Sequence, residues 1–387
     1  MSARPLVSVI IPTHNRATVL PKALDSVYAQ QGIGKQFDLE VIVVDDASTD
    51  TTPTVVQHSY AAARYIRLTK NRGLAGARNA GLVVTQGAFV AFLDDDDVWL
   101  PHRLQVQLPV LERHPEAGAV YSQVYYPSSH NPAGKKKYPD LSQARSGQIF
   151  TSLLAGNFMA VHSVLVRRHV FAKTGYFDED LSLSEDWDMW LRLSFHFPFL
   201  FLPDVVAVYN ASTDGMWKGA SRARQEENCT RIIEKALQML PDSPAHVELK
   251  RTTRARVALT YARTWEKVLA VLRAHPDIVC HNWAQRYVRL WVRKQSLETE
   301  SSVSTAQELC AQVKAAIPHK RLKERWGLRK MVAEIWADIA HSLASDSQAR
   351  QRDAAHAAAR AVAHLPSYGL HVTLMRMIFR GAIAKSR

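Results

Sequence analysis

The sequence predicts an α/β fold in which a mostly parallel sheet carries helices on both faces and is followed by an α-helical C-terminal region. Two observations support this prediction. Between residue 6 and about residue 120, short runs of β-branched and other apolar residues alternate with stretches of helical periodicity, as in parallel strands joined by crossover helices. After residue 220 the strand-like runs stop, and apolar residues recur at helical spacing, for example between residues 254 and 272.

Six short apolar runs are predicted to be the strands of this sheet. They span residues 7–11, 40–44, 64–68, 88–93, 163–166 and 199–208. Helices are predicted between the first four strands, the third of them from Gly73 to Val84, and a further helix is predicted to begin near Ser184. Open sheets of this type bind ligands beyond the carboxyl ends of their strands, so the residues that follow each strand are the candidates for function.

The chain has 387 residues, which exceeds what one hydrophobic core usually organises, and this predicts two parts. Residues 1–215 hold the predicted sheet, and residues 216–387 are predicted to be helical. Within the first part, residues 128–147 are rich in proline, glycine and lysine and are predicted to form a mobile loop, which is either a lid or an insertion without a role. Residues 354–364 and 370–383 are predicted to form a helical hairpin.

The formal net charge of +13 is distributed unevenly along the chain. Residues 211–387 hold 30 of the 49 lysines and arginines but only 16 of the 36 aspartates and glutamates, whereas the first 210 residues hold 19 and 20. A basic helical region can face anionic lipid, nucleic acid or only water. We expect a solvated face or peripheral contact with an anionic membrane, and no nucleic-acid partner.

The cysteines and the N-terminus indicate a cytoplasmic protein. Cys229, Cys280 and Cys310 are widely spaced and lack the Cys-x-x-Cys pattern of zinc or redox sites, so we expect reduced thiols. Residues 1–5 are short and polar and do not resemble a secretory signal. No apolar run approaches the roughly 20 residues that span a bilayer. The expected location is therefore the cytoplasm, with the inner membrane face as the place of any peripheral contact.

Four consecutive aspartates, Asp94 to Asp97, follow directly after the predicted strand 88–93. Adjacent carboxylates repel one another, and oxygen-rich sites suit hard divalent cations such as Mg²⁺ or Mn²⁺, which would compensate the charge. A cation held at this strand end would also neutralise a departing diphosphate. The alternative is a solvated acidic turn without a ligand.

Polar residues also follow the first two predicted strands. Asp45 and Asp46 end the second strand, where one of them can accept a hydrogen bond from a nucleobase imide or a ribose hydroxyl. Alternatively, the pair caps the helix that follows. The first strand ends in the segment 12–16 (PTHNR), in which the imidazole of His14 can stack on a nucleobase.

Two further segments offer groups for phosphate binding and for proton transfer. Residues 71–79 (NRGLAGARN) open a predicted helix with glycines, and Arg72 and Arg78 can reach phosphate groups there, although the spacing is not that of a Walker loop or a dinucleotide fingerprint. Glu185 and Asp186 lie at the start of another predicted helix, where the backbone dipole stabilises an ionised carboxylate. Such a carboxylate can act as a general base, or it can merely stabilise the helix.

Taken together, these segments resemble glycosyltransferase family 2, a group of inverting enzymes with the Rossmann-like GT-A fold. The resemblance covers residue 6 to about residue 215, with the motifs in order and at family-like spacing. The matching segments are 7–16 (VSVIIPTHNR), 43–50 (VVDDASTD), 71–81 (NRGLAGARNAG), 92–101 (FLDDDDVWLP), 175–179 (GYFDE) and 184–193 (SEDWDMWLRL).

The resemblance implies a transferase that takes a sugar from a nucleotide-diphosphate donor, above all a UDP-sugar, with the help of Mg²⁺ or Mn²⁺. Residues 1–125 would form the nucleotide-binding part and residues 145–215 the acceptor part. The donor contacts that carry over are Pro12, His14, Arg16, Asp46, Arg78, Asp94 and Asp95. Asp96, together with Asp94, would hold the metal.

The family's catalytic base corresponds to Asp186, and Glu185 beside it would bind the acceptor. The family's chemistry is direct displacement at the anomeric carbon, so an α-linked donor would give a β-linked product. The acceptor would be the hydroxyl of a saccharide, a lipid-linked sugar or another alcohol. The family context favours a role in cell-surface polysaccharide or glycolipid synthesis.

One departure from the family pattern concerns the metal. Many relatives carry a histidine near position 209, whereas residues 209–215 (YNASTDG) contain none, so Asn210, Asp214, or water and phosphate would complete the coordination. Two other functions are alternatives to a glycosyltransferase. A nucleotidyltransferase that makes the activated sugar usually has a glycine-rich loop after its first strand, which is missing here. A non-catalytic sugar- or nucleotide-binding protein would not need every acidic position intact.

Overall fold

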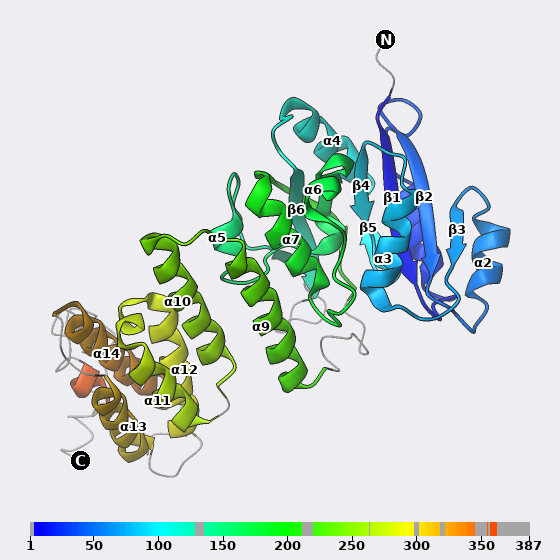
Figure 1. Cartoon of the computed structure of the whole chain (residues 1–387). Coiled ribbons are helices and arrows are strands. Elements are labelled where there is room, and N and C mark those ends of the chain that lie inside the picture. Colours follow the sequence, from blue (N-terminus) through cyan, green and yellow to red (C-terminus); the bar gives the residue numbers. More distant parts are fainter. Residues whose placement is uncertain are drawn as a thin grey trace. The chain divides into compact units, whose positions relative to one another are not determined.

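The computed structural model of the chain describes residues 4–127, 135–210, 220–262, 264–297, 302–317, 322–344, 354 and 357–361 (Figure 1). Two compact units are present, Met1–Pro241 and Asp242–Arg387. The first unit extends beyond residue 215, where the sequence predicts the catalytic domain to end. The reason is that helix α9 (Arg222–Gln238) joins it, with Lys235 Nζ lying 2.7 Å from carboxylate oxygens of both Asp178 and Asp188.

The first unit is built on one nine-stranded sheet with the strand order β3-β2-β1-β4-β8-β6-β9-β5, in which β7 pairs with β6 (Figure 1). The strands are β1 (Leu6–Thr13), β2 (Asp38–Asp45), β3 (Arg64–Arg67), β4 (Phe89–Phe92), β5 (Val98–Trp99), β6 (Ala119–Pro127), β7 (Lys135–Tyr138), β8 (Val164–Arg167) and β9 (Phe199–Val208). Strands β5, β7 and β8 are antiparallel to their neighbours, and the other six share one direction. The carboxyl ends of these six strands therefore lie along one edge of the sheet.

Helices cover both faces of the sheet, as the sequence predicts. The helices of this unit before α9 are α1 (Leu20–Tyr28), α2 (Thr52–Ser59), α3 (Gly73–Val84), α4 (Arg103–Arg113), α5 (Phe150–Leu153), α6 (Phe171–Thr174) and α7 (Glu185–His196). Apolar residues of α1, α2 and α4 share one buried cluster with Val7, Val9 and Ile11 of β1. Because side chains alternate along a strand, Ile10 points to the opposite face, where it packs against Gly81 of α3.

The segment 128–147, which the sequence predicts to be a mobile loop, is partly a strand. Residues 135–138 form β7, which pairs antiparallel with the end of β6 so that Val124 lies opposite Tyr138 and Tyr126 opposite Lys136. A run of three lysines hides this strand from a sequence pattern, because an edge strand tolerates charged side chains that a central strand does not. Residues 128–134 lie outside the described residues.

The second unit is helical, as predicted. It contains α10 (Pro244–Thr260), α11 (Trp265–Ala274), a 3₁₀ helix (Pro276–Cys280), α12 (Asn282–Leu297), α13 (Ser302–Ala316) and α14 (Leu322–Ala344). The periodic stretch 254–272 is divided between two helices, because Thr264 caps α11 by accepting a hydrogen bond from the Lys267 amide (3.3 Å). Of the predicted hairpin, Ala354 and residues 357–361 are helical and the rest lies outside the described residues. Among the described helices, none is both long and apolar enough to cross a membrane.

Candidate active site

The carboxyl edge of the sheet gathers the polar segments that the sequence singles out. Residues 13–16 follow β1, Asp46 follows β2, the four aspartates follow β4, and Asn210 follows β9. Strand β8 runs in the opposite direction, so the residues that precede it, including Asn157 and His162, also lie at this edge. Strand direction alone therefore brings segments from five parts of the chain to one place.

The acidic loop Asp94–Asp97 is held from β9. The carboxylate of Asp97 is fully buried and accepts a hydrogen bond from the Asn210 amide (2.8 Å), while the side-chain amide of Asn210 donates to the Asp96 carbonyl (2.8 Å). Asn210 was one of the residues expected to replace the missing histidine. In the structure it positions the loop backbone. Asp214, the other, lies outside the described residues.

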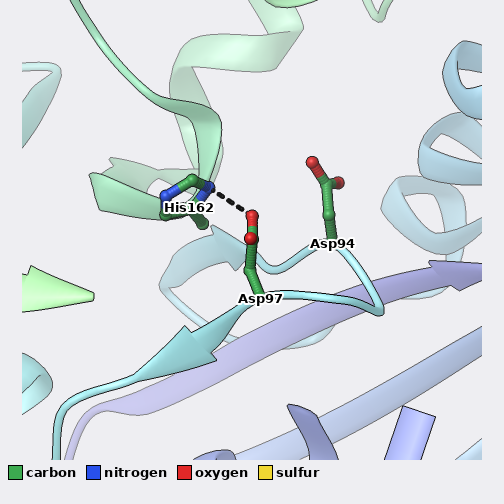
Figure 2. Close-up of side chains that lie close together, drawn as sticks. All are labelled: Asp94, Asp97 and His162. Atoms are coloured by element: carbon green, nitrogen blue, oxygen red, sulfur yellow. Dashed lines mark ion pairs between the residues drawn. The ribbon is translucent and has the colours of Figure 1, made fainter. Parts of the chain in front are cut away.

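Three potential metal ligands meet beside this loop: Asp94, Asp97 and His162 (Figure 2). Their ligand atoms lie within 4.8 Å of one another, and Nδ1 of His162 is 2.9 Å from Oδ2 of Asp97. Burial lowers the pKa of His162, but the Asp97 carboxylate outweighs burial and raises it above its ordinary value. Both ring nitrogens of His162 and Oδ2 of Asp97 are buried without a well-formed hydrogen bond, which suits a site that binds a cation.

The other two aspartates of the loop, Asp95 and Asp96, lie outside this three-residue group. Burial and the neighbouring carboxylates raise the pKa of Asp96 to about 6, and burial raises that of Asp95 to about 7, partly opposed by the nearby hydroxyl of Thr13. Among the described residues, Asp96 forms an ion pair with Arg16, whose Nη2 lies 4.0 Å from Oδ2 of Asp96. The loop thus has more negative charge than its protein partners compensate, and the residues present fit a divalent cation.

The structure groups Asp94 with Asp97 and His162, whereas the sequence predicts Asp94 with Asp96 as metal ligands. Asp96 lies outside the three-residue group, and its role as a ligand stays a prediction. Sequence reasoning assigned no role to His162, because a lone histidine before a strand carries no ligand spacing. The sequence places His162 directly before a predicted strand. This position puts it at the carboxyl edge only if that strand is antiparallel to its neighbours, which the sequence does not reveal.

Beyond the ends of β1 and β2, the edge contains a network of contacts around Asp46. His14 contacts the Asp46 carbonyl through Nδ1 (2.7 Å), and the Asp46 carboxylate accepts a hydrogen bond from the Arg72 amide (2.7 Å). Asp45, in contrast, is fully buried and accepts from the Ser48 amide (2.7 Å) and from the Tyr65 hydroxyl. Asp45 therefore stabilises the turn, as a capping residue would, whereas Asp46 lies beside His14.

Arg78 connects the acidic loop to the start of α7. Its side chain is 1% exposed, and its guanidinium lies 2.6 Å from Asp94 Oδ1 and 2.5 Å from Glu185 Oε1. Both donor nitrogens at the end of the side chain are thus engaged by carboxylates. The predicted contact of Arg78 with a diphosphate stays a prediction. The structure shows that Arg78 joins Glu185, 107 positions later in the chain, to Asp94, 16 positions later.

Asp186 lies next to this ion-pair cluster. Its carboxylate accepts hydrogen bonds from the Asn157 side chain (3.0 Å) and from the Trp187 amide (2.8 Å). Burial and the neighbouring Glu185 raise the pKa of Asp186 to about 7, against the opposing effects of Arg78 and of both hydrogen bonds. A partly exposed carboxylate with a raised pKa is suited to accept a proton near neutral pH.

The sequence of this chain is similar to those of known proteins. The family described as glycosyl transferase family 2 matches residues 8–175. An uncharacterized protein of Mycobacterium tuberculosis is 28% identical over 325 residues, which cover 78% of this chain and 90% of that protein. A protein of Haemophilus influenzae named as an uncharacterized glycosyltransferase is 30% identical over 191 residues, 49% of this chain and 62% of that protein.

Two solved structures share the architecture. The mannosyltransferase PcManGT of Pyrobaculum calidifontis, in complex with GDP-Man and Mn²⁺, has a TM-score of 0.53 and is 23% identical, covering 81% of this chain and 86% of that one. Residues 1–349 of S. aureus TarS, in complex with UDP-GlcNAc, have a TM-score of 0.54 and are 18% identical, covering 84% and 90%. The family match and this shared fold agree with the motifs at the carboxyl edge. Residues 8–175 therefore form a glycosyl transferase family 2 domain, and the chain is a glycosyltransferase with the GT-A fold.

Proposed function

We propose that this enzyme transfers a sugar from a nucleoside diphosphate donor to a hydroxyl acceptor with inversion at the anomeric carbon, and that Asp186 is the general base. The observation that carries the proposal is the ion-pair cluster of Arg78 with Asp94 and Glu185. This cluster fixes the start of α7 beside the acidic loop, which supports a base and a cation site at one edge of the sheet. A nucleotidyltransferase or a non-catalytic binding protein would not require Asp186 there.

In the proposed reaction, Asp186 takes the proton of the acceptor hydroxyl while that oxygen forms a bond to the anomeric carbon. The bond between this carbon and the diphosphate oxygen breaks, and its electron pair leaves with the diphosphate. Attack from the face opposite the leaving group inverts the configuration. Asn157 orients the Asp186 carboxylate, and Glu185 keeps the pKa of Asp186 raised, so the base is ready near neutral pH.

The acidic loop would hold Mg²⁺ or Mn²⁺ through Asp94, with Asp97 and His162 or with the predicted Asp96. When bound, the cation supplies positive charge that stabilises the departing diphosphate. His14, Asp46 and the end of β1 would hold the base and ribose. The structural neighbours were solved with a UDP-sugar and a GDP-sugar, which supports the nucleotide-sugar class of donor, and the expected UDP-sugar stays a prediction.

The acceptor would be a hydroxyl of a saccharide, a lipid-linked sugar or another alcohol. A role in cell-surface polysaccharide or glycolipid synthesis is the broader form of the proposal. The predicted peripheral contact of the basic C-terminal region with an anionic membrane is proposed on its charge alone.

Hydrolysis of the donor tests this function without a known acceptor, since water can take the place of the alcohol. The whole chain is incubated with UDP-glucose, UDP-galactose, UDP-GlcNAc or GDP-mannose, each with Mn²⁺, Mg²⁺ or EDTA, and release of the nucleoside diphosphate is measured. We expect slow, cation-dependent hydrolysis of one donor. Proton NMR during the first minutes should show the sugar released as the anomer opposite to that of the donor.

The base is tested in the same assay with a matched pair of variants. Asp186→Asn removes the proposed base and should abolish hydrolysis. Asp180→Asn changes a carboxylate six positions earlier that is largely exposed and contacts Arg231, and it should keep hydrolysis. Release of the sugar with retained configuration, or full activity in Asp186→Asn, would contradict the proposal.

A further inference from the structure

Three tyrosines from different segments gather at the carboxyl edge and are not accounted for by the proposed function. Tyr126 ends β6, Tyr138 ends β7, and Tyr209 follows β9. The rings of Tyr126 and Tyr209 are parallel within 3° with centroids 4.5 Å apart, and the Tyr126 and Tyr138 centroids are 6.2 Å apart. We call these three residues the tyrosine cluster.

The tyrosine cluster lies between the acidic loop and the proposed base. On one side, Tyr209 stacks on His162 with centroids 5.7 Å apart, and His162 pairs with Asp97. On the other side, the Tyr138 hydroxyl donates to the Asn157 carbonyl (2.8 Å), and the side chain of Asn157 donates to Asp186. Burial and the charge of Asp186 raise the pKa of Tyr138 to about 12, which also shows how close the two groups are.

The exposure of the cluster indicates a ligand surface. Tyr126 is 39% exposed although one face of its ring is covered by Tyr209, and it reaches the proposed base only through Tyr138 and Asn157. Aromatic side chains offer a large apolar surface with little conformational entropy to lose, and tyrosine adds a hydroxyl for hydrogen bonding. The C–H face of a pyranose ring is the complement of such a surface, while its hydroxyl groups remain free to reach polar neighbours.

We propose that the tyrosine cluster is the acceptor subsite and that Tyr126 stacks against a pyranose ring, so that the acceptor is a saccharide or a glycoside and not a sugar-free alcohol. The inference rests on the proposed function and deepens it. The proposed base Asp186 must contact an acceptor hydroxyl. The sugar ring that carries this hydroxyl can then pack against the tyrosine cluster at the same edge of the sheet. Through its hydrogen bond to Asn157, Tyr138 fixes the position of the tyrosine cluster relative to Asp186.

Saturation-transfer difference NMR tests the subsite without a donor. The probes are the octyl β-glycosides of glucose, galactose, mannose and N-acetylglucosamine, with 1-octanol as the sugar-free comparison. We expect at least one glycoside, and not octanol, to receive saturation, strongest at the ring protons of one face. Equal saturation of octanol and the glycosides, or no saturation of any glycoside, would overturn the inference.

Variants show whether Tyr126 makes this contact. Tyr126→Ala should weaken glycoside binding, and raise KM for the glycoside in transfer, by about tenfold, which corresponds to about 1.4 kcal/mol, because the substitution removes the stacking surface. kcat should fall less than KM rises. Tyr126→Phe keeps the ring and should bind nearly as the natural chain does, which separates loss of stacking from loss of folding. Unchanged binding by Tyr126→Ala would overturn the inference.

Tyr28 provides a matched control. It is 37% exposed and stacks on Tyr60 with ring planes 12° apart, so it resembles Tyr126 in exposure and in having a tyrosine neighbour. It lies at the end of α1, and because that helix runs back from the carboxyl edge, Tyr28 is remote from the site. Tyr28→Ala should bind glycosides unchanged. If donors are hydrolysed but Tyr126→Ala binds glycosides normally, the inferred acceptor subsite is refuted and the proposed function is not. If no donor is hydrolysed, the proposed function is refuted, and the glycoside-binding measurements still test the subsite independently.

Discussion

At the scale of single residues, Arg78 compensates the charge of the buried carboxylate of Glu185 and of the partly exposed Asp94. Removing a charge from water costs several kcal/mol, and an ion pair offsets that cost only when both partners are present. Arg78 is 1% exposed, and its partner Glu185 is 7% exposed by side chain, so neither group is solvated. A neutral residue at position 78 would leave Glu185 and Asp94 next to each other without a cation.

Arg78→Ala is therefore expected to lower the free energy of unfolding of the first unit by about 3–5 kcal/mol, the cost of an unpaired buried charge. Arg72→Ala is the matched control, since Arg72 pairs with Glu179 at 2.6 Å but both side chains are 37% exposed. This exposed pair should contribute less than about 1 kcal/mol. Urea unfolding of the two variants measures both values, and equal losses would show that Arg78 is not specially placed.

The raised pKa of Asp186 predicts how activity depends on pH. Only the ionised carboxylate accepts a proton, and burial with Glu185 raises its pKa to about 7 from an ordinary 3.8. Activity should therefore fall as the pH drops through about 7. Asn157→Ala removes a hydrogen bond that favours the ionised form, so its acidic limb should lie at still higher pH. The pH profile of donor hydrolysis checks both, and a limb near pH 4 in the natural chain would contradict them.

At the scale of elements, the site depends on turns that take up unusual backbone angles. Asn15, Ala47 and Ser184 have φ values of 55°, 63° and 59°. Asn15 and Ala47 lie between a strand and the helix that follows, and Ser184 directly precedes α7. Asn15 offsets the strain of the first two turns, because its side-chain oxygen accepts from the Thr49 amide (2.7 Å) and its own amide donates to Ser48 (2.9 Å). Strain of this kind persists where surrounding contacts fix it, commonly at functional sites.

The packing of α3 on β1 sets the backbone position from which the Arg78 side chain extends. A Cβ atom added at Gly81 would lie 2.6 Å from Cγ2 and 3.1 Å from Cγ1 of the fully buried Ile10. Gly81→Ala should gain about 1 kcal/mol of helix propensity but lose more from overpacking, about 1–3 kcal/mol, because Ile10 has no space to move into. The net result is a small loss of stability and a shift of α3 away from the sheet.

Val83→Ala in the same helix is the control for Gly81→Ala. Val83 is 67% exposed, so its replacement removes little buried surface and should leave thermal stability unchanged or slightly higher. Thermal unfolding measures the two variants, and donor affinity should fall only in Gly81→Ala because α3 carries Arg78. A stabilised Gly81→Ala would mean that the helix can shift without cost.

At the scale of the whole molecule, two hydrophobic clusters among the described residues are not shared by the two units. One cluster of buried residues lies entirely between Val7 and Ala207, and another lies entirely between Ala255 and Ala361. The described residues thus form two units with separate cores, divided near Pro241. A domain with its own core is expected to fold without its neighbour.

A fragment of residues 1–241 should therefore unfold cooperatively and hydrolyse the same donor as the whole chain. It retains the whole sheet, the acidic loop and α9, whose Lys235 contacts Asp188 of α7. Circular dichroism during urea unfolding and the donor assay measure the two properties. An aggregated fragment of 1–241, beside an active whole chain, would show that the second unit is needed for the first to fold.

The sequence by itself determined the α/β fold, the helical C-terminal region and the sheet edge at which the polar motifs gather. These features depend on local periodicity and on polar residues placed directly after strands, and both are visible along the chain. The family follows from the same motifs, which the comparison with known proteins confirmed. The edge strand β7 and the cap at Thr264 were not predictable, because lysines and a single threonine carry no periodic pattern.

Only the tertiary structure decided which side chains meet at that edge. The two carboxylate partners of Arg78, the place of His162 beside Asp97, and the stacking of Tyr126 on Tyr209 join residues far apart in sequence. Each depends on strand order and direction, above all on the reversal at β8. Strand pairing is fixed by burial and register across the whole sheet, which the periodicity of one segment does not record.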